Sequence, residues 1–236
     1  MGSYIKIFSL IIFTGVISTL ALIAGLVDRS HNLYFKLSRI FSNGVLKIAG
    51  IKLEISGKEN INDKASYIYA ANHSSLFDIP AMQAAVPQQT SIVYKKELAK
   101  IPLFGWQMLA GPYILIDRKK ADSARKSIEQ AKKMMSEKGR SVLLFPEGTR
   151  SKTGEVQPFK RGAFYLASKA GQPIVPVSLS GTDKILPKGK FRLKKGTIHI
   201  HYGEPVETEN VTSKKDEMEL MEKVRNIIIR NLKKGN

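Results

Sequence analysis

The pattern of apolar and polar residues divides the chain into two unequal parts near residue 50. Before this point the apolar residues form long, nearly continuous runs, and after it short apolar segments alternate with longer amphipathic ones. Short apolar runs predict buried strands, and the longer periodic segments predict helices. We therefore expect membrane-associated helices over residues 1–50 and an α/β domain over residues 51–236.

Two helices are expected in the N-terminal part. The stretch from Ile7 to Val27 carries no charge and is long enough to cross a bilayer as a helix. A signal peptide is the alternative, but no convincing small-x-small cleavage site precedes the polar sequence. From His31 to Ala49, apolar residues are mixed with basic ones, which is typical of an amphipathic helix at a membrane surface.

Small residues in the first helix favour a hairpin. Thr14 and Ser18 are four apart, as are Gly15 and Thr19, and this spacing can seat a second helix. We therefore favour a monotopic helical hairpin over the alternative of one spanning helix followed by a surface helix. Basic residues follow the apolar run far more often than they precede it. The positive-inside rule then places the rest of the chain on the cytoplasmic face of the cell (inner) membrane.

Strand and helix signals alternate from residue 51 onward. Strands are expected at Ile51–Ile55, Tyr67–Ala71, Ser91–Tyr94, Tyr113–Ile116, Ser141–Phe145, Ile174–Leu179 and Thr197–Tyr202, and helices near residues 78–86, 102–110, 121–138, 162–170 and 214–234. This order predicts a mixed, mostly parallel sheet flanked by helices. Pro176 cannot donate to a strand ladder and so indicates an edge strand or a bulge.

The charge balance limits the partners. Lys and Arg number 38 against 20 Asp and Glu, which gives a net charge of +18. Such a chain attracts nucleic acid, anionic lipid headgroups or acidic substrates and partners. The absence of cysteine excludes disulfides and a cysteine nucleophile.

The most informative stretch runs from Asn72 to Pro80 and follows a predicted strand. Pro80 suits the first turn of a helix, which places Asp78 near a helix start and His73 on the loop before it. The chain can then fold back so that the carboxylate fixes the tautomer of the imidazole and raises the basicity of its other nitrogen. The pair would form a general base, although an N-cap at Asp78 and a turn residue at His73 remain alternatives.

A second stretch, Phe145–Ser151, also follows a predicted buried strand, where open α/β sheets bind their ligands. Gly148 lets backbone amides approach an anion, and Arg150 offers a bidentate fork for phosphate. Glu147 can accept hydrogen bonds from ligand hydroxyls. Taken alone, the same residues can form a simple turn.

Further cations lie near other strand ends. Arg118 follows the strand that ends at Ile116 and is a phosphate candidate, with a surface ion pair to Asp117 as the alternative. Lys95 and Lys96 follow the strand that ends at Tyr94. Most such charges in proteins are simply solvated.

Four stretches taken together resemble the four ordered blocks of the glycerolipid acyltransferase family, and in particular the bacterial 1-acylglycerol-3-phosphate (lysophosphatidate) acyltransferases. These stretches are Asn72-His73 with Asp78, Ile116–Arg118, Phe145–Ser151 and Ile174–Val177. The resemblance covers roughly residues 51–202, with no departure at the motif positions. A His and an Asp with four residues between them are a weak signal alone but a specific one in this combination.

The resemblance implies a reaction. His73 would take the proton from the sn-2 hydroxyl of 1-acyl-sn-glycerol 3-phosphate, and Asp78 would orient His73. The hydroxyl would attack the thioester of acyl-carrier protein or acyl-CoA directly, with no acyl-enzyme, giving phosphatidic acid. No metal, cofactor or nucleic acid is expected, and an anionic phospholipid bilayer would hold the domain.

The resemblance also implies binding roles. The phosphate would be held by Arg118 and Arg150 with the Gly148 amide, Glu147 would contact the glycerol end, and Thr149 belongs to the same substrate-binding stretch. Candidate oxyanion donors are Lys95, Lys96 or the backbone amides near Asn72 to Ser74.

Three rival interpretations remain. The first is an acyltransferase of the same family that acts on another lysophospholipid or on glycerol 3-phosphate. The second is an acyl-enzyme mechanism through Ser74 or Ser75, although no Gly-x-Ser-x-Gly elbow is present. The third is a basic membrane-bound binding protein, which would leave His73, Asp78 and Glu147 without a role.

Overall fold

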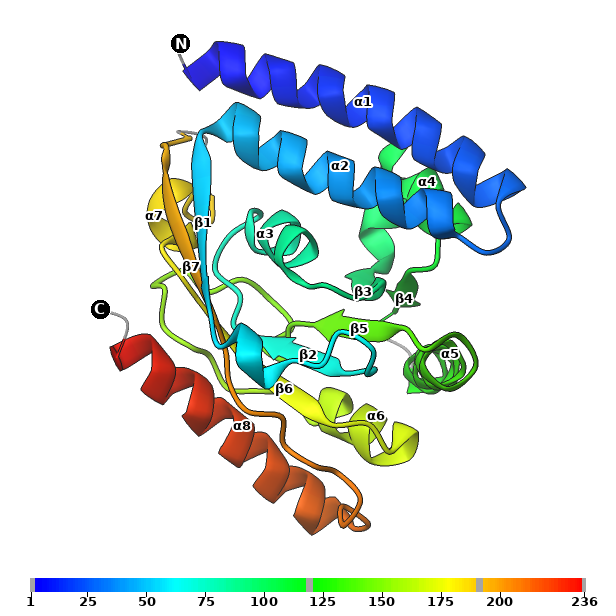
Figure 1. The fold of residues 1–236 in the computed structure, drawn as a ribbon, viewed down its shortest axis with the longest axis vertical. Helices are drawn as coiled ribbons and strands as arrows, with labels where there is room; N and C mark the ends of the chain where they lie inside the picture. Colours follow the sequence, from blue (N-terminus) through cyan, green and yellow to red (C-terminus); the bar gives the residue numbers. More distant parts are fainter. Residues whose placement is uncertain (1–2, 118–120, 190–192, 235–236) are drawn as a thin grey trace.

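The computed structural model describes residues 3–117, 121–189 and 193–234, and its centre is a seven-stranded sheet with the order β1-β7-β6-β2-β5-β3-β4 (Figure 1). The strand pairs are parallel except for β6 and β7, which run antiparallel. The sheet is therefore mixed and mostly parallel, as the alternating pattern predicts. The strands are β1 (Ile51–Ser56), β2 (Ile68–Ala71), β3 (Thr90–Lys95), β4 (Ile114–Ile116), β5 (Ser141–Leu144), β6 (Ile174–Ser180) and β7 (Gly196–Tyr202).

Helices cover both faces of the sheet (Figure 1). The short strand β2 is apolar throughout because both of its faces are buried. Ile68 and Ala70 pack into one hydrophobic cluster, and Tyr69 and Ala71 pack into the other. The cluster with Ile68 and Ala70 takes residues from α5, α6 and α8, and the cluster with Tyr69 and Ala71 takes residues from α1 to α4. These helices are α1 (Ser3–Val27), α2 (Asn32–Ala49), α3 (Asp78–Ala85), α4 (Phe104–Ala110), α5 (Ala121–Lys138), α6 (Gly162–Ala170), α7 (Thr182–Ile185) and α8 (Lys214–Lys234), with 3-10 turns at Lys58–Asn60 and Lys96–Lys100.

Pro176 does not mark an edge strand. It lies in β6, between β2 and β7, in register with Ala70 of β2. The antiparallel ladder with β7 extends only to Val177, so the missing N–H of Pro176 falls beyond the end of that ladder. Its carbonyl accepts a hydrogen bond from the amide of Gly203 at 2.9 Å. A central strand tolerates this proline because no strand partner needs its proton.

The first two helices form a hairpin whose ends are tied together (Figure 1). The Asp28 carboxylate accepts hydrogen bonds from the amides of Ser30 and Leu33, which fixes the start of α2. At the other end, Lys6 Nζ donates to the carbonyl of Ala49 in the last turn of α2 at 2.8 Å. Tyr4–Val27 is long and apolar enough to cross a membrane, and little of it is buried within the protein.

The contact between these two helices differs in part from the expected one. Ser18 is buried, but nothing lies within 4 Å of a Cβ placed on Gly15, so Gly15 does not seat a helix. Instead, the Phe13 ring stacks on Phe41 with centroids 6.2 Å apart and lies against Gly44, where a Cβ would collide with it. The small residue that allows the approach is therefore in α2. A spacing rule applied to α1 alone does not find it.

The side chain of Asn72 extends the pairing of β2 with β6 beyond the last strand residue. Its Nδ2 donates to the carbonyl of Leu179 at 2.9 Å, and its Oδ1 accepts from the amide of Leu179 at 2.8 Å. The amide thus replaces a backbone peptide group in the ladder. Because Asn72 is held in this way, the chain leaves the carboxyl end of β2 at a fixed point, and His73 begins there.

Candidate active site

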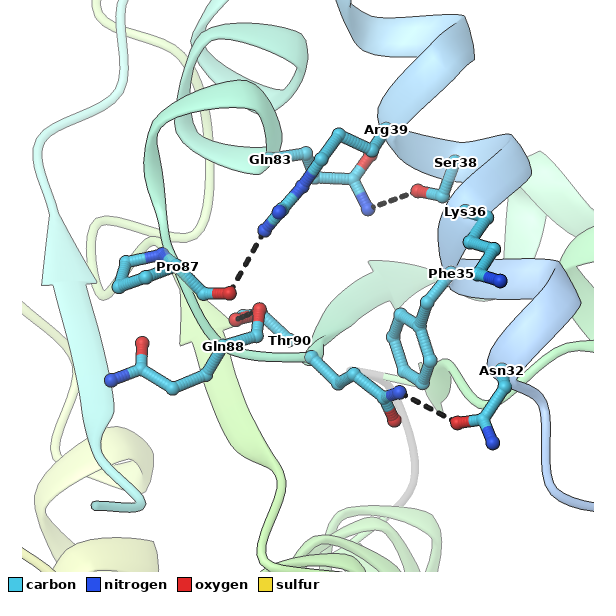
Figure 2. A pocket seen from close by; sticks show the side chains of 10 residues that line it. Asn32, Phe35, Lys36, Ser38, Arg39, Gln83, Pro87, Gln88 and Thr90 are labelled. Atoms are coloured by element: carbon cyan, nitrogen blue, oxygen red, sulfur yellow. Dashed lines mark hydrogen bonds between the residues drawn. The ribbon is translucent and has the colours of Figure 1, made fainter. Parts of the chain in front are cut away.

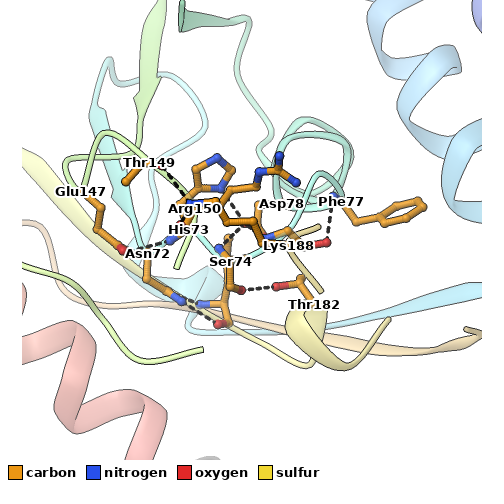
Figure 3. Close-up of polar contacts among 12 residues, drawn as sticks. Asn72, His73, Ser74, Phe77, Asp78, Glu147, Thr149, Arg150, Thr182 and Lys188 are labelled. Atoms are coloured by element: carbon orange, nitrogen blue, oxygen red, sulfur yellow. Dashed lines mark hydrogen bonds and ion pairs between the residues drawn. The ribbon is translucent and has the colours of Figure 1, made fainter. Parts of the chain in front are cut away.

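His73 and Asp78 meet at the carboxyl end of β2 (Figure 3). His73 lies on the loop after the strand, and Asp78 is the first residue of α3. The His73 Nδ1 and Asp78 Oδ2 atoms are 2.6 Å apart, and the Asp78 side chain is 0% exposed. The same Oδ2 accepts hydrogen bonds from the amides of Ser74 and Ser75, each at 2.8 Å. The carboxylate therefore orients the imidazole and the loop backbone at once.

The remaining surface of the imidazole is only partly covered. Because the carboxylate accepts, Nδ1 carries the proton of that hydrogen bond and Nε2 is left as a proton acceptor. The ring stacks on Phe145, with centroids 4.1 Å apart and planes 23° from parallel. The His73 side chain is 15% exposed, which leaves access for a reacting hydroxyl. This is the arrangement that a general base needs.

Glu147 lies behind the catalytic loop. It is 3% exposed, and its Oε1 accepts a hydrogen bond from the amide of His73 at 2.7 Å. Its Oε2 accepts from the amide and side chain of Gln157 at 3.2 and 3.0 Å. Burial raises the pKa of Glu147 to about 7, although these hydrogen bonds favour the charged form. Both oxygens thus accept hydrogen bonds from protein donors, so the carboxylate anchors the loop, and its contact with a glycerol hydroxyl stays a prediction.

The turn that follows β5 carries the expected cation. Gly148 has φ +73, a conformation that favours glycine, and its amide donates to the carbonyl of Phe145 at 3.0 Å. This amide closes the turn and is not available to a phosphate. Thr149 is exposed and Arg150 is half-buried. The amide of Ser151 donates to the carbonyl of His73 at 2.7 Å, which ties the turn to the catalytic loop.

The other predicted site residues are the cations near strand ends and the backbone amides of the catalytic loop. Lys96 forms an ion pair with Asp117 at 3.2 Å, while Lys95 lies in β3 in register with Ile116 of β4. Arg118 lies outside the described residues. The amides of His73 and Ser74 are occupied by Glu147 and Asp78, so these two are not free oxyanion donors.

Sequence reasoning missed the segment that follows β6. Ser74 Oγ lies 2.8 Å from Thr182 Oγ1 in α7, and Ser75 Oγ donates to the carbonyl of Leu186 at 2.9 Å. Lys188 Nζ donates to Thr149 Oγ1 at 3.2 Å and to the carbonyl of Arg150 at 2.7 Å. The fourth motif ends before this segment, and the contacts join residues far apart in the sequence, so no local pattern indicates them.

An apolar cavity of about 70 Å³ lies between the N-terminal helices and α3. It includes Ile79, the neighbour of Asp78, and its polar lining groups are bonded to one another: Gln83 Nε2 donates to Ser38 Oγ and Tyr113 Oη at 2.7 and 2.6 Å. The lining residues are Ile17, Ser18, Ala21, Tyr34, Ser38, Phe41, Ile79, Gln83, Ile92, Leu98, Phe104, Gln107, Met108 and Tyr113.

A larger polar pocket, of about 320 Å³, lies between α2 and the amino end of β3 (Figure 2). Arg39 spans part of it, and its Nη2 donates to the carbonyls of Val86 and Pro87 at the end of α3. Open α/β sheets bind their ligands beyond the carboxyl ends of the strands, where His73 lies. The polar pocket is at the opposite ends of the strands, so we assign the active site to His73 and not to this pocket.

Comparison with known proteins identifies the family of the chain. The family model for acyltransferases matches residues 52–180. The 1-acyl-sn-glycerol-3-phosphate acyltransferase of Saccharomyces cerevisiae is 34% identical over 225 residues, covering 94% of this chain and 72% of the yeast protein. The enzyme of the same name from Limnanthes douglasii is 35% identical over 204 residues, covering 86% of this chain and 70% of its own length.

A solved structure extends the likeness to the whole chain. The crystal structure of the 1-acyl-sn-glycerophosphate (LPA) acyltransferase PlsC from Thermotoga maritima superposes with a TM-score of 0.78 at 27% identity. The match covers 98% of this chain and 97% of the Thermotoga chain. Sequence, fold and the geometry around His73 thus lead to one conclusion: the chain is an enzyme of the acyltransferase family, to which the matching 1-acyl-sn-glycerol-3-phosphate acyltransferases belong.

Proposed function

We propose that the protein transfers an acyl chain from a thioester donor to the sn-2 hydroxyl of 1-acyl-sn-glycerol 3-phosphate, which gives phosphatidic acid. The observation that carries the mechanism is the 2.6 Å contact between His73 Nδ1 and the buried Asp78 carboxylate. The acceptor is supported by the names of the matching enzymes and by the cationic Arg150 on the neighbouring turn.

The reaction proceeds by direct transfer. As the acceptor oxygen bonds to the thioester carbonyl carbon, His73 Nε2 takes the hydroxyl proton, and Asp78 stabilises the imidazolium that forms. The tetrahedral intermediate then collapses, the carbon–sulfur bond breaks, and the proton passes from His73 to the leaving thiolate. The hydroxyls of Ser74 and Ser75 are bonded to Thr182 and the Leu186 carbonyl. This engagement argues against an acyl-serine intermediate.

The surroundings of the base suggest how the substrates bind. Arg150 provides a planar fork for the phosphate of the acceptor, in the geometry that guanidinium groups use for phosphates. The apolar cavity beside Ile79 is suited to part of an acyl chain. The net charge of +18 favours an anionic donor, and both acyl-CoA and acyl-carrier protein meet that description.

The N-terminal hairpin would hold this site at a membrane surface. The outward side of α1 exposes large apolar residues, among them Phe8, Ile11 and Ile23. Helix α1 also packs along both α2 and α4, and Lys6 bonds to the end of α2, so α1 cannot leave the domain without breaking these contacts. A monotopic hairpin on the cytoplasmic face of the inner membrane therefore explains the exposed surface better than a separate spanning helix.

The reaction is tested by acyl transfer to 1-acyl-sn-glycerol 3-phosphate in mixed micelles, with acyl-CoA and acyl-carrier protein as donors. We expect wild type to form phosphatidic acid and His73→Ala to lose at least ~100-fold in rate, because the base is removed. His201→Ala, on strand β7, is the matched control and should retain the wild-type rate. Folded wild type that leaves this acceptor unchanged with both donors would refute the proposed acceptor.

The role of Glu147 can be tested through pH. A carboxyl group with a raised folded-state pKa binds its proton more tightly in the folded state. The protonated carboxyl of Glu147 therefore contributes fully to the free energy of unfolding below its ordinary pKa of 4.5. This contribution is lost as pH rises to about 7. The thermal unfolding midpoint of wild type should therefore fall relative to that of Glu147→Gln, which carries no titrating proton at this position, as pH rises across this range. Glu155→Gln, an exposed carboxylate of the same loop, is the control, and a difference independent of pH would contradict the assignment.

The hairpin makes a topological prediction. The protein has no cysteine, so Ser3→Cys at the start of α1 introduces a single thiol. In sealed membranes, a membrane-impermeant thiol reagent should label it only from the cytoplasmic side. Asn210→Cys, an exposed position in the catalytic part, should be labelled from the same side. Labelling of Ser3→Cys from the opposite side would show that α1 spans the bilayer.

A further inference from the structure

The segment that follows β6 and ends at Gly189 lies against the catalytic loop (Figure 3). Its contacts with Ser74 and Ser75 hold it against the catalytic loop. Its last contact, from Lys188, reaches the turn that carries Arg150: Nζ donates to Thr149 Oγ1 at 3.2 Å and to the Arg150 carbonyl at 2.7 Å. A second cation is thus fixed on the same turn as the guanidinium.

The two cations have no acidic partner within the described ranges. Neither Lys188 nor Arg150 takes part in an ion pair there, and both side chains are half-buried. The buried carboxylates of the site are already engaged, Asp78 by His73 and Glu147 by Gln157. Both cations therefore lie at one turn and are partly withdrawn from water, where a bound anion would offset their positive charge.

The donor geometry indicates what that anion is. An ammonium group has three protons, and Lys188 uses two of them on Thr149 and Arg150, which leaves one for a ligand. The lysine acts as a compact point charge, while Arg150 can bind two oxygens at once. A phosphate monoester carries a charge of about −1.5 to −2 near neutral pH and has three terminal oxygens. A phosphodiester has one charge and fewer free oxygens, so it cannot satisfy both cations equally.

We propose that Lys188 and Arg150 form a two-cation site that selects acceptors with a phosphate monoester over lysophospholipids with a phosphodiester headgroup. The inference rests on the proposed function and goes beyond it, because it assigns acceptor selectivity to a residue outside the four motifs. Lys188 binds the phosphate directly through its third proton and keeps Arg150 in place through the other two.

A purely structural role for Lys188 has a different signature. If the lysine only supported the turn, its loss would lower the rate for every acceptor, whatever the headgroup. If it binds the phosphate, its loss raises KM for the monoester and changes the diester and uncharged acceptors little. The test therefore compares acceptors that share one acyl chain: 1-acyl-sn-glycerol 3-phosphate, the matching lysophosphatidylglycerol and the matching monoacylglycerol.

The variants are Lys188→Gln, Lys188→Arg and Lys184→Gln. Lys184 is the matched control because it lies in α7, is exposed, and makes no side-chain hydrogen bond or ion pair in the part of the chain that the structure describes. Lys188→Gln should raise KM for the monoester by about 10-fold or more, since it removes a charge-assisted hydrogen bond. Lys188→Arg should recover most of the affinity, and Lys184→Gln should match wild type.

A binding measurement separates the failure of this inference from failure of the proposed function. Calorimetric titration with glycerol 3-phosphate and with glycerophosphoglycerol needs no acyl transfer. Wild type and Lys184→Gln should bind the monoester at least several-fold more tightly than the diester, and Lys188→Gln should lose this preference. If the monoester preference persists in Lys188→Gln, or if all acceptors slow equally, the two-cation site is refuted. If the preference is lost as expected but wild type transfers no acyl chain, only the proposed reaction fails.

Discussion

The active site depends on one buried carboxylate. Asp78 is fully buried, yet its Oδ2 receives hydrogen bonds from His73 and from the amides of Ser74 and Ser75, while Oδ1 has no partner within the described residues. An unpaired buried charge is costly, so these three donors and the amino end of α3 must offset the lost hydration. Because they converge on one oxygen, the loop between β2 and α3 is held in a single shape, with Nε2 of His73 as its reactive atom.

The rest of the structure keeps this loop in place from several sides. Asn72 fixes its start against β6, and Glu147 holds the His73 amide. The hydroxyls of Ser74 and Ser75 are bonded to Thr182 of α7 and to the carbonyl of Leu186 just after it. Each of these contacts joins segments that are distant in the sequence but close at the carboxyl ends of the parallel strands. The parallel sheet is therefore what brings the motifs together, and its two buried faces explain why the central strands are mostly apolar.

The sequence predicts what depends on local pattern. Every strand was located to within a residue or so at each end, since apolar runs bounded by turn residues are local signals, and the proximity of His73 to Asp78 follows from Pro80 at the helix start. The engagement of Glu147 by Gln157 and the contacts of Lys188 were not predictable. They depend on how separate loops meet, and neither periodicity nor spacing reports that. The interior position of Pro176 was missed for a similar reason, because it depends on where β7 ends.

The most direct test of this account is the rate of acyl transfer by Asp78→Asn. The asparagine oxygen can still accept from the amides of Ser74 and Ser75, so the loop should keep its shape, which circular dichroism and the unfolding midpoint can check. With that oxygen in the place of Oδ2, which also faces His73 Nδ1, the variant lacks the negative charge that stabilises the imidazolium formed on proton abstraction. The account predicts a folded variant whose rate falls by about 100-fold or more. A folded Asp78→Asn with a rate within a few-fold of wild type would contradict it.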